Sequence, residues 1–213
     1  MAPSPYWGKE PIWDSRTTTH NPMLDEQGRV WFTARVRPAR NPDFCRKDQV
    51  FPLESANRHL SMYDPKTGKF TLVGTCFSTH HLVFAEDANH TLWTSSGGAG
   101  SGVIGWLDRK LFDETGDERK AQGWTPFILD TNGNGRRDEY VQPDAAADPA
   151  KDRRVLTGLY SVAVNPQDGT VWGTSLGFPG YVVRVDPGPD PSRTALTEIY
   201  EPPMPGYGPR GGS

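Results

Sequence analysis

A short hairpin pattern that occurs three times constrains the fold of this chain more than any other feature. The three segments are HNPMLDEQGRVWFTA (20–34), HLVFAEDANHTLWTSS (81–96) and YSVAVNPQDGTVWGTS (160–175). Each has a short apolar run, then a polar turn containing Gly or Asn, then an apolar residue followed by Trp. Two apolar runs around such a turn predict a pair of antiparallel strands. We therefore expect three equivalent hairpins with Trp31, Trp93 and Trp172 in equivalent places.

Two further hairpins accompany the first and third repeats. Segments 58–74 and 180–203 each contain two strand-like runs, and in both the first run ends in Asp-Pro. Proline ends a hydrogen-bonded ladder, and Asp can bond the backbone of its own turn. A Trp hairpin paired with one of these outer hairpins would make a four-stranded blade, which is the repeating unit of a β-propeller.

The composition also favours an all-β fold. The chain has 213 residues, with 23 Gly, 20 Pro, 7 Trp, 7 Tyr and 9 Phe. Many turn-forming residues interleaved with aromatic ones are typical of short strands joined by turns. We expect one all-β β-propeller domain over residues 1–213, with three to four four-stranded blades. Because closed propellers have about 4–8 blades, this domain is expected to be part of a larger propeller. Its exposed blade edge could then pair with a second copy.

Three polar stretches, at about 36–56, 97–125 and 130–154, separate the repeats. Because of them, the spacing between successive repeated Trp residues exceeds the ~40–50 residues of one propeller blade. We therefore expect long loop insertions that are functional or mobile. The Gly-rich run at 95–106 lacks the Gly-Lys-Ser/Thr ending of a phosphate loop, which favours a flexible loop or a bulged strand. The run DRKLFDET that follows indicates a helical turn inside a solvated insertion.

Charge and hydropathy limit the partners. The formal net charge of -3 and the pI near 5.9 give no global attraction to nucleic acid or to an anionic membrane. No apolar run approaches the ~20 residues that span a bilayer, and MAPSPYWGK lacks the order of a signal peptide. We expect a soluble protein with a small-molecule or glycan partner. It would be cytoplasmic, or periplasmic or secreted if a leader has been removed.

Cys45 and Cys76 are the only cysteines. They could form one disulfide or remain two unrelated thiols, because a single pair does not establish a disulfide framework. Neither cysteine has the CxxC or Cys/His spacing of a zinc site. Both alternatives stay open at this point.

The first repeat resembles the blade repeat of the streptogramin B (virginiamycin B) lyase-like seven-bladed propellers; gluconolactonase-like and NHL-type propellers are similar but weaker matches. The resemblance lies in the order His, apolar run, Asp, turn Gly and Val-Trp-Phe-Thr within residues 20–33. It implies a lyase that uses a His, a Glu after the Trp-Phe-Thr run, and Mg²⁺. His20 stands at the His position, but the Glu position holds Ala34, with Ser96 and Ser175 in the other repeats. Only this resemblance therefore implies Mg²⁺, and these positions lack the carboxylate that would bind the ion.

Residues at the starts of the inner strands are the best candidates for chemistry, since propeller ligands usually lie where these strands meet the central channel. An imidazole can act near neutral pH as a general base or as a metal ligand. The alternative for each of these His residues is a hydrogen-bonded structural role. The expected catalytic residues are His20, His80, His81 and Tyr160. The expected substrate-binding residues are Asn21, Trp106 and Asp108.

The stretch DTNGNGRRDEY (130–140) carries acid and amide side chains at alternate positions, as calcium-binding loops do. The expected metal ligands are Asp130, Asn132, Asn134, the carbonyl of Arg136 and Asp138. The twelfth position, where an EF-hand loop has a bidentate acid, is Val141, so Glu139 or a neighbouring loop would have to complete the shell. The other interpretation is an Asn-Gly turn at the tip of a hairpin. The two are compatible, and any Ca²⁺ is expected to be structural.

Two functions remain open. The first is a propeller enzyme that acts on a small polar or carbohydrate-like substrate by lyase or hydrolase chemistry, on a glycoside or a lactone, at the channel mouth. The second is a non-catalytic propeller scaffold that binds a protein or glycan and carries a structural calcium loop. The sequence has no His-Glu-x-x-His motif, so it lacks that template of a zinc hydrolase.

Overall fold

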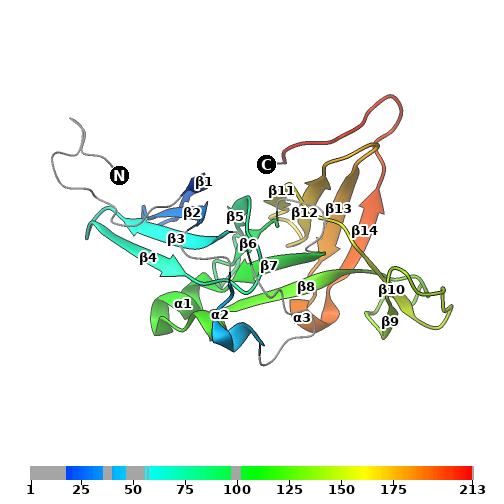
Figure 1. Cartoon of the computed structure of the whole chain (residues 1–213), viewed down its shortest axis with the longest axis horizontal. Helices are drawn as coiled ribbons and strands as arrows, with labels where there is room; N and C mark the ends of the chain where they lie inside the picture. The colour runs from blue at the N-terminus through cyan, green and yellow to red at the C-terminus, as the bar shows by residue number, and fades with distance from the viewer. Residues whose placement is uncertain (1–17, 36–39, 47–55, 57, 97–101, 213) are drawn as a thin grey trace.

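The protein is all-β and contains three antiparallel four-stranded meanders that follow one another along the chain (Figure 1). This computed structural model describes residues 18–35, 40–46, 56, 58–96 and 102–212. In Figure 1 the three meanders stand side by side, with the first at the left and the third at the right. The all-β expectation is confirmed.

The first meander contains β1 (Thr19–Leu24), β2 (Val30–Ala34), β3 (His59–Asp64) and β4 (Lys69–Val73), paired in that order. All its pairings are antiparallel. A short 3₁₀ helix, η1 (Asp43–Arg46), lies between β2 and β3. The hairpins expected at 20–34 and 58–74 are both present.

The second meander contains β5 (Leu82–Phe84), β6 (Leu92–Thr94), β7 (Val103–Leu107) and β8 (Gln122–Leu129). Helices α1 (Arg109–Thr115) and α2 (Glu118–Ala121) connect β7 to β8. The expectation that 97–125 is a loop insertion was therefore wrong. This segment contains the third strand of the meander and the start of the fourth. Two helices lie between β7 and β8, so this strand pair has no local turn signal.

The third meander contains β11 (Ser161–Val164), β12 (Val171–Ser175), β13 (Tyr181–Asp186) and β14 (Leu196–Tyr200). Helix α3 (Pro191–Thr194) connects β13 to β14. One parallel pairing, between Thr197 of β14 and Leu129 of β8, joins this meander to the second. Both hairpins expected in this part of the chain are confirmed.

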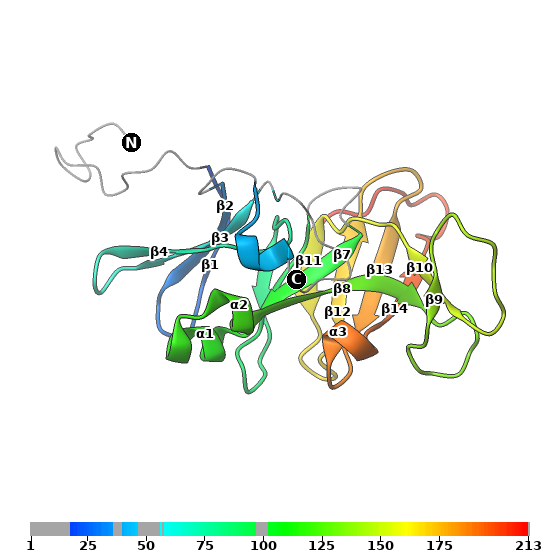
Figure 2. The same cartoon turned by 60° about the horizontal axis from the view of Figure 1, so that its bottom comes forward.

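The segment 130–154 does project from the meanders, beside the outer strands β8 and β14 (Figure 2). It carries β9 (Tyr140–Val141) and the beginning of β10 (Asp152–Val155). Strand β10 pairs antiparallel with β8 and parallel with β9. The expected hairpin across the loop 130–138 was therefore wrong, because β9 does not pair with β8.

The core lies between consecutive meanders rather than within one of them. One buried cluster packs between the first two meanders and includes Trp31, Leu60 and Leu107. A second packs between the last two and includes Trp93, Phe127 and Val183. The first strand of the second meander, β5, contacts both β1 and β11, so the first strands of the three meanders are neighbours.

The three repeated Trp residues occupy equivalent positions, as expected: each is the second residue of the second strand of its meander. Trp31 and Trp93 are buried in the two clusters, whereas Trp172 is half-buried and stacks on Tyr200 with 6.2 Å between ring centroids. The first two rings thus fill the space between neighbouring sheets.

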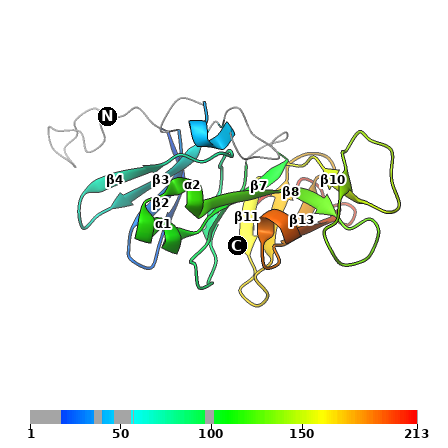
Figure 3. The same ribbon diagram turned by 90° about the horizontal axis from the view of Figure 1, so that it is seen from below.

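Cys45 and Cys76 form a disulfide, with 5.4 Å between their Cα atoms, which connects η1 to the chain after β4. Much of the expected insertion at 36–56, and residues 97–101 of the Gly-rich run, lie outside the described residues. Seen from below, α1, α2 and α3 lie along the lower side of the strands (Figure 3). None of the described helices has the length and apolar character that crossing a membrane requires.

Candidate functional site

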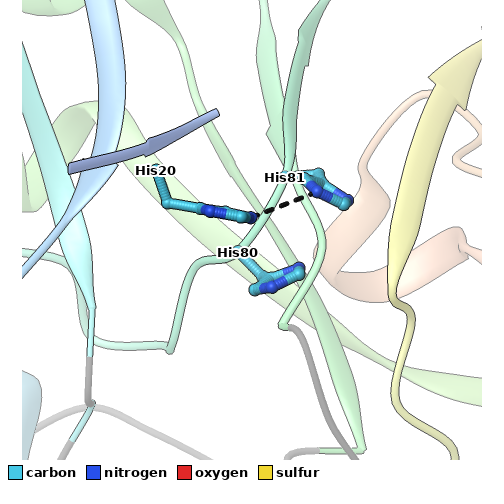
Figure 4. Close-up of side chains that lie close together, drawn as sticks. All are labelled: His20, His80 and His81. Carbon is cyan, nitrogen blue, oxygen red and sulfur yellow. Dashed lines mark hydrogen bonds between the residues drawn. The ribbon is translucent and has the colours of Figure 1, made fainter. Parts of the chain in front are cut away.

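Three histidine side chains from two meanders meet at one point (Figure 4). His20 lies in β1, and His80 and His81 lie directly before β5. The Nε2 atoms of His20 and His81 are 3.2 Å apart. One ligand nitrogen from each of the three rings can be chosen so that all lie within 4.8 Å of one another. The structure thus brings together all three histidines that the sequence singled out.

A bulge in β1 directs His20 toward the other two rings. The pairing of β1 with β2 shifts register between His20 and Met23, and Asn21 in this interval has φ of 46°. Asn21 is one of the residues that tolerate this left-handed conformation. Its Oδ1 accepts a 2.7 Å hydrogen bond from the backbone N–H of Leu82. Asn21 therefore connects β1 to β5, and its expected role in substrate binding stays a prediction.

Two hydroxyl groups hold the backbone of the histidines. Thr33 Oγ1 contacts the carbonyl oxygens of both His20 and His80. Ser95 Oγ accepts a 3.0 Å hydrogen bond from the N–H of His81 and donates one of 2.8 Å to the carbonyl of Tyr160. Because both hydroxyls are fully buried, these bonds fix the geometry of the cluster without competition from water.

Tyr160, at the start of the third meander, borders the same cluster. Its ring centroid lies 4.8 Å from those of His80 and His81. Its carbonyl oxygen lies 3.2 Å from Nδ1 of His80. The guanidinium of Arg210 lies 5.7 Å from the Tyr160 ring centroid, within the range of a cation–π contact. Tyr160 thus joins the site, where its carbonyl is the group that orients a histidine; its catalytic role stays a prediction.

The environment keeps the three imidazoles neutral. Burial lowers the pKa of His20, His80 and His81, and the positive charge of Arg58 lowers it further. For His80 and His81 the carbonyl of Tyr160 acts in the opposite direction. Burial costs the charged form its hydration, and an adjacent cation repels it. A neutral imidazole can use a ring nitrogen as a base or as a metal ligand.

The tautomer of His80 follows from its hydrogen bond. Because a carbonyl oxygen can only accept, Nδ1 of His80 is the protonated nitrogen, and Nε2 keeps its lone pair. A histidine that binds a metal commonly donates its other N–H to a backbone carbonyl in this way. Ligands of tetrahedral Zn²⁺, at about 2.0–2.1 Å from the ion, lie roughly 3.3 Å from one another. The 3.2 Å between His20 and His81 has this length.

Three imidazoles suit zinc and similar transition metals, whereas Mg²⁺ prefers oxygen ligands. Ala34, Ser96 and Ser175 stand where the resemblance places a carboxylate, and none of them has one. The cluster therefore does not fit the Mg²⁺ that the resemblance implied.

Arg58 is a residue of this site that the sequence did not reveal. Its carbonyl accepts a 3.3 Å hydrogen bond from the N–H of Thr79, which precedes the two adjacent histidines. Within the described part of the chain, its Nη1 is buried and has no hydrogen-bond partner. No local pattern marks Arg58, because it approaches the cluster through pairing between distant segments.

Trp106 and Asp108 do not join the histidines. They line a separate cleft of about 570 Å³, between the second and third meanders, near the end of β5 opposite His81. The carboxylate of Asp108 accepts a 2.9 Å hydrogen bond from the N–H of Leu111 and caps α1. Trp106 packs on Trp93 with 5.2 Å between ring centroids. The course of β7 places these residues at the far end of the sheet from the histidines, and their expected role in substrate binding stays a prediction.

The five expected calcium ligands lie together in one exposed loop between β8 and β9. Gly133 and Gly135 have φ of 75° and 73°, as the two Asn-Gly pairs predict. Glu139, the proposed closing acid, instead pairs with Lys151, whose Nζ lies 2.9 Å from Oε2. Whether the loop binds metal stays a prediction.

No family model and no curated protein matches this chain. Among solved structures, the chain is similar to PorZ, described as an essential bacterial surface component of the type-IX secretion system of Porphyromonas gingivalis. The match covers 86% of this chain and 22% of that one, at 17% identity and a TM-score of 0.43. A similarity of this size carries no information about activity.

Proposed function

We propose that the chain is three blades of a larger propeller, of the seven-bladed type that the resemblance implies. Each meander would be one blade. The support is the position of the cores between consecutive sheets and the adjacency of the first strands β1, β5 and β11, which is the arrangement of inner strands around a propeller channel. Strand β4 would then be an edge through which two copies could associate.

We further propose that His20, His80 and His81 bind a divalent transition metal and form the centre of a lyase or hydrolase. The observation that carries this proposal is the convergence of three neutral imidazoles on one point, with His80 oriented by the carbonyl of Tyr160. Three protein ligands would leave a coordination position for substrate or water, as catalytic zinc sites do. Zn²⁺ in such a site polarises a carbonyl oxygen or lowers the pKa of a bound water.

The residues around the cluster favour a small substrate that is polar and anionic. The unpaired Nη1 of Arg58 could bind a carboxylate or phosphate oxygen, since guanidinium groups match these anions. The ring of Tyr160 would form one wall of the site. A lactone or ester with a nearby negative charge has both the carbonyl and the anion that this arrangement could hold.

Metal binding is the first test. The EDTA-treated 213-residue chain is titrated with ZnCl₂ by calorimetry, and Co²⁺ is added separately to record the visible absorption of a tetrahedral site. We expect one site, with at least a 10-fold loss of affinity for His20→Ala, His80→Ala and His81→Ala. His90→Ala, at an exposed histidine outside the cluster, is the matched control. Binding that is the same in all four variants would overturn the metal proposal.

Turnover is the second test. We expect hydrolysis of p-nitrophenyl acetate, or of an aryl ester with a carboxylate, to require Zn²⁺ and to fall at least 10-fold in His20→Ala and His81→Ala. Arg58→Gln should raise KM for the carboxylate-bearing ester more than for the neutral one. Zn²⁺ binding without turnover on either ester or on a lactone panel would contradict the enzyme and favour a binding protein.

The cleft near Trp106 favours glycan binding as a second candidate function. Trp106 and five acidic residues line it, and aromatic faces together with groups that bind hydroxyls are a suitable lining for a sugar. The lining acids are Glu86, Asp87, Asp108, Asp168 and Asp186. Glycan-array binding lost in Trp106→Ala, but kept in His81→Ala, would support this function. Binding to no glycan on the array would remove it.

A further inference from the structure

The loop 130–138 is folded around the carboxylate of Asp130. Its Oδ1 accepts hydrogen bonds from the N–H groups of Gly133 and Asn134, at 2.7 and 3.2 Å, and its Oδ2 accepts one from Gly135 at 2.7 Å. Five oxygen-bearing positions surround one centre in such a loop. These hydrogen bonds by themselves stabilise a turn and do not indicate a bound cation.

Asp152, at the start of β10, supplies an independent indication of a cation. The residue is fully buried, with 0% of its surface exposed. Its Oδ2 accepts a 2.7 Å hydrogen bond from the N–H of Asp138, the last ligand position of the loop. Its other oxygen, Oδ1, is buried and makes no hydrogen bond within the described residues, although the N–H of Thr131 also faces this carboxylate. A buried carboxylate oxygen without a partner is costly.

The charges around Asp152 increase this cost. The carboxylates of Asp130 and Asp138 lie near enough for their negative charges to act on this group. The guanidinium of Arg137 is near enough to interact with the charge of Asp152, and its Nη1 donates a 2.8 Å hydrogen bond to Thr125 Oγ1 in β8. Three carboxylates at the base of one loop attract a cation. Among the described residues only the three histidines already converge as a metal-binding group, so the cation would have to draw these carboxylate oxygens together.

We propose that Asp152 is the missing acid of a Ca²⁺ site, and that it completes the shell formed by the loop. The loop ligands would be Asp130, Asn132, Asn134, the carbonyl of Arg136 and Asp138. Every donor is an oxygen, which suits Ca²⁺ rather than a transition metal. The closing acid comes from a distant strand instead of from the twelfth loop position.

The two asparagines mark where the cation would lie. Nδ2 of Asn132 and Nδ2 of Asn134 both approach Oδ2 of Asp138, so two amide N–H groups now face this carboxylate. Rotation of each amide by 180° would present an oxygen to the same place. It would also break the hydrogen bonds that Oδ1 of Asn132 and Oδ1 of Asn134 accept from the N–H groups of Asn134 and Arg136, at 3.1 and 2.8 Å. Ca²⁺ would thus replace the amide N–H groups as the partner of Asp138.

The metal would fix the projecting segment to the outer strand of the second meander. Asp152 pairs with Tyr140 between β10 and β9, and the next three residues of β10 pair with β8. A cation held by both the loop and Asp152 would therefore restrain β9, β10 and β8 together. The site is distinct from the histidine cluster and does not depend on its function.

The decisive experiment compares wild type with Asp152→Asn in EDTA and in CaCl₂. Calorimetric titration of the EDTA-treated 213-residue chain with CaCl₂ should show one site, and Asp152→Asn and Asp130→Ala should each weaken it at least 10-fold. Asp144→Asn, at an exposed acid of the same segment, is the matched control and should bind as wild type does.

The midpoints of thermal unfolding separate a metal ligand from a structural carboxylate. In EDTA, Asp152→Asn should unfold at or above the temperature of wild type, because it removes a buried charge; in CaCl₂ the order should reverse. Absence of CaCl₂ binding by wild type would overturn the site. Equal binding by Asp152→Asn and wild type would overturn the role of Asp152, as would a lower midpoint of this variant in EDTA.

Discussion

The indole Nε1 of Trp31 donates a 2.9 Å hydrogen bond to Oδ2 of Asp25, in the turn of the first repeat. The same oxygen lies 2.6 Å from Nε of Arg29 and 3.5 Å from Nη1 of Arg109. Arg109 belongs to α1 and is 1% exposed. This network joins the first meander to the second, because it places the buried cation Arg109 of the second against the buried carboxylate of Asp25 in the first.

Substitution of Arg109 by Ala should destabilise the protein by about 3 kcal/mol, because it leaves the carboxylate of Asp25 buried with fewer partners. The free energy of unfolding is measured by urea denaturation with circular dichroism. Arg193→Ala, at a cation that is 85% exposed in its side chain, should change it little, since surface ion pairs contribute little. Equal effects of the two substitutions would show that the buried network does not couple the meanders.

The histidine cluster should make the protein less stable as the pH falls below 6.5, the ordinary pKa of these groups. The pKa values of His20, His80 and His81 are lowered from 6.5, so the unfolded chain binds protons at a higher pH than the folded one. The contribution of the neutral imidazoles is therefore complete above pH 6.5 and is lost as pH falls through the lowered values. Because the rings are coupled, the loss belongs to the cluster rather than to one residue.

The check is urea denaturation of the metal-free protein at several pH values. His80→Gln should reduce the fall in unfolding free energy below pH 6.5, because one proton-binding group is removed from the buried cluster. His90→Gln, outside the cluster, should show the same dependence of the unfolding free energy on pH as wild type. An unchanged dependence in His80→Gln would contradict the burial of neutral imidazoles.

Local patterns were sufficient to predict most of the strands. The hairpins that contain Trp31, Trp93 and Trp172 have an apolar run on each side of a polar turn, and the structure pairs them as expected. The pair β7–β8 escaped prediction because α1 and α2 lie in its connection. Two successive helices between paired strands leave no turn signal at a fixed spacing, whereas the single short helix α3 between β13 and β14 follows an Asp-Pro that marks the end of the first strand.

Only those residues of the candidate site that lie at the beginnings of the repeats could be predicted from the sequence. His20, His81 and Tyr160 are the first residues of the three repeats, so the repeat itself predicts that they approach one another. Arg58 and Asp152 meet their partners through pairing between distant segments. No periodicity within the sequence encodes such contacts, and the structure was needed to find them.

Reduction of the disulfide between Cys45 and Cys76 should destabilise the protein by about 2–4 kcal/mol, because the bridge restricts the unfolded chain. Thermal unfolding with and without a reductant measures the change. The double substitution Cys45→Ala and Cys76→Ala should reproduce the reduced protein and should not respond to the reductant. A midpoint that reductant leaves unchanged in wild type would contradict this contribution.

Gly173 in β12 should tolerate no side chain, since a Cβ there would lie 2.7 Å from the carbonyl oxygen of Ser161 and 2.6 Å from Cδ1 of Leu159. The first contact is with the backbone of the paired strand, which cannot rotate away. Overpacking of this kind costs about 1–3 kcal/mol. Because Leu159 and Ser161 flank Tyr160, Gly173→Ala should also weaken binding of Zn²⁺ to the histidine cluster.

Gly212→Ala is the control for this prediction, because its added Cβ would make only ordinary contacts of 3.7 Å with Ala163 and Ser161. Urea denaturation and ZnCl₂ titration are applied to both variants. If Gly173→Ala loses stability but binds Zn²⁺ as tightly as Gly212→Ala does, the strain is absorbed within β12 and does not reach Tyr160. If both properties fall together, the third meander positions the metal site of the first two.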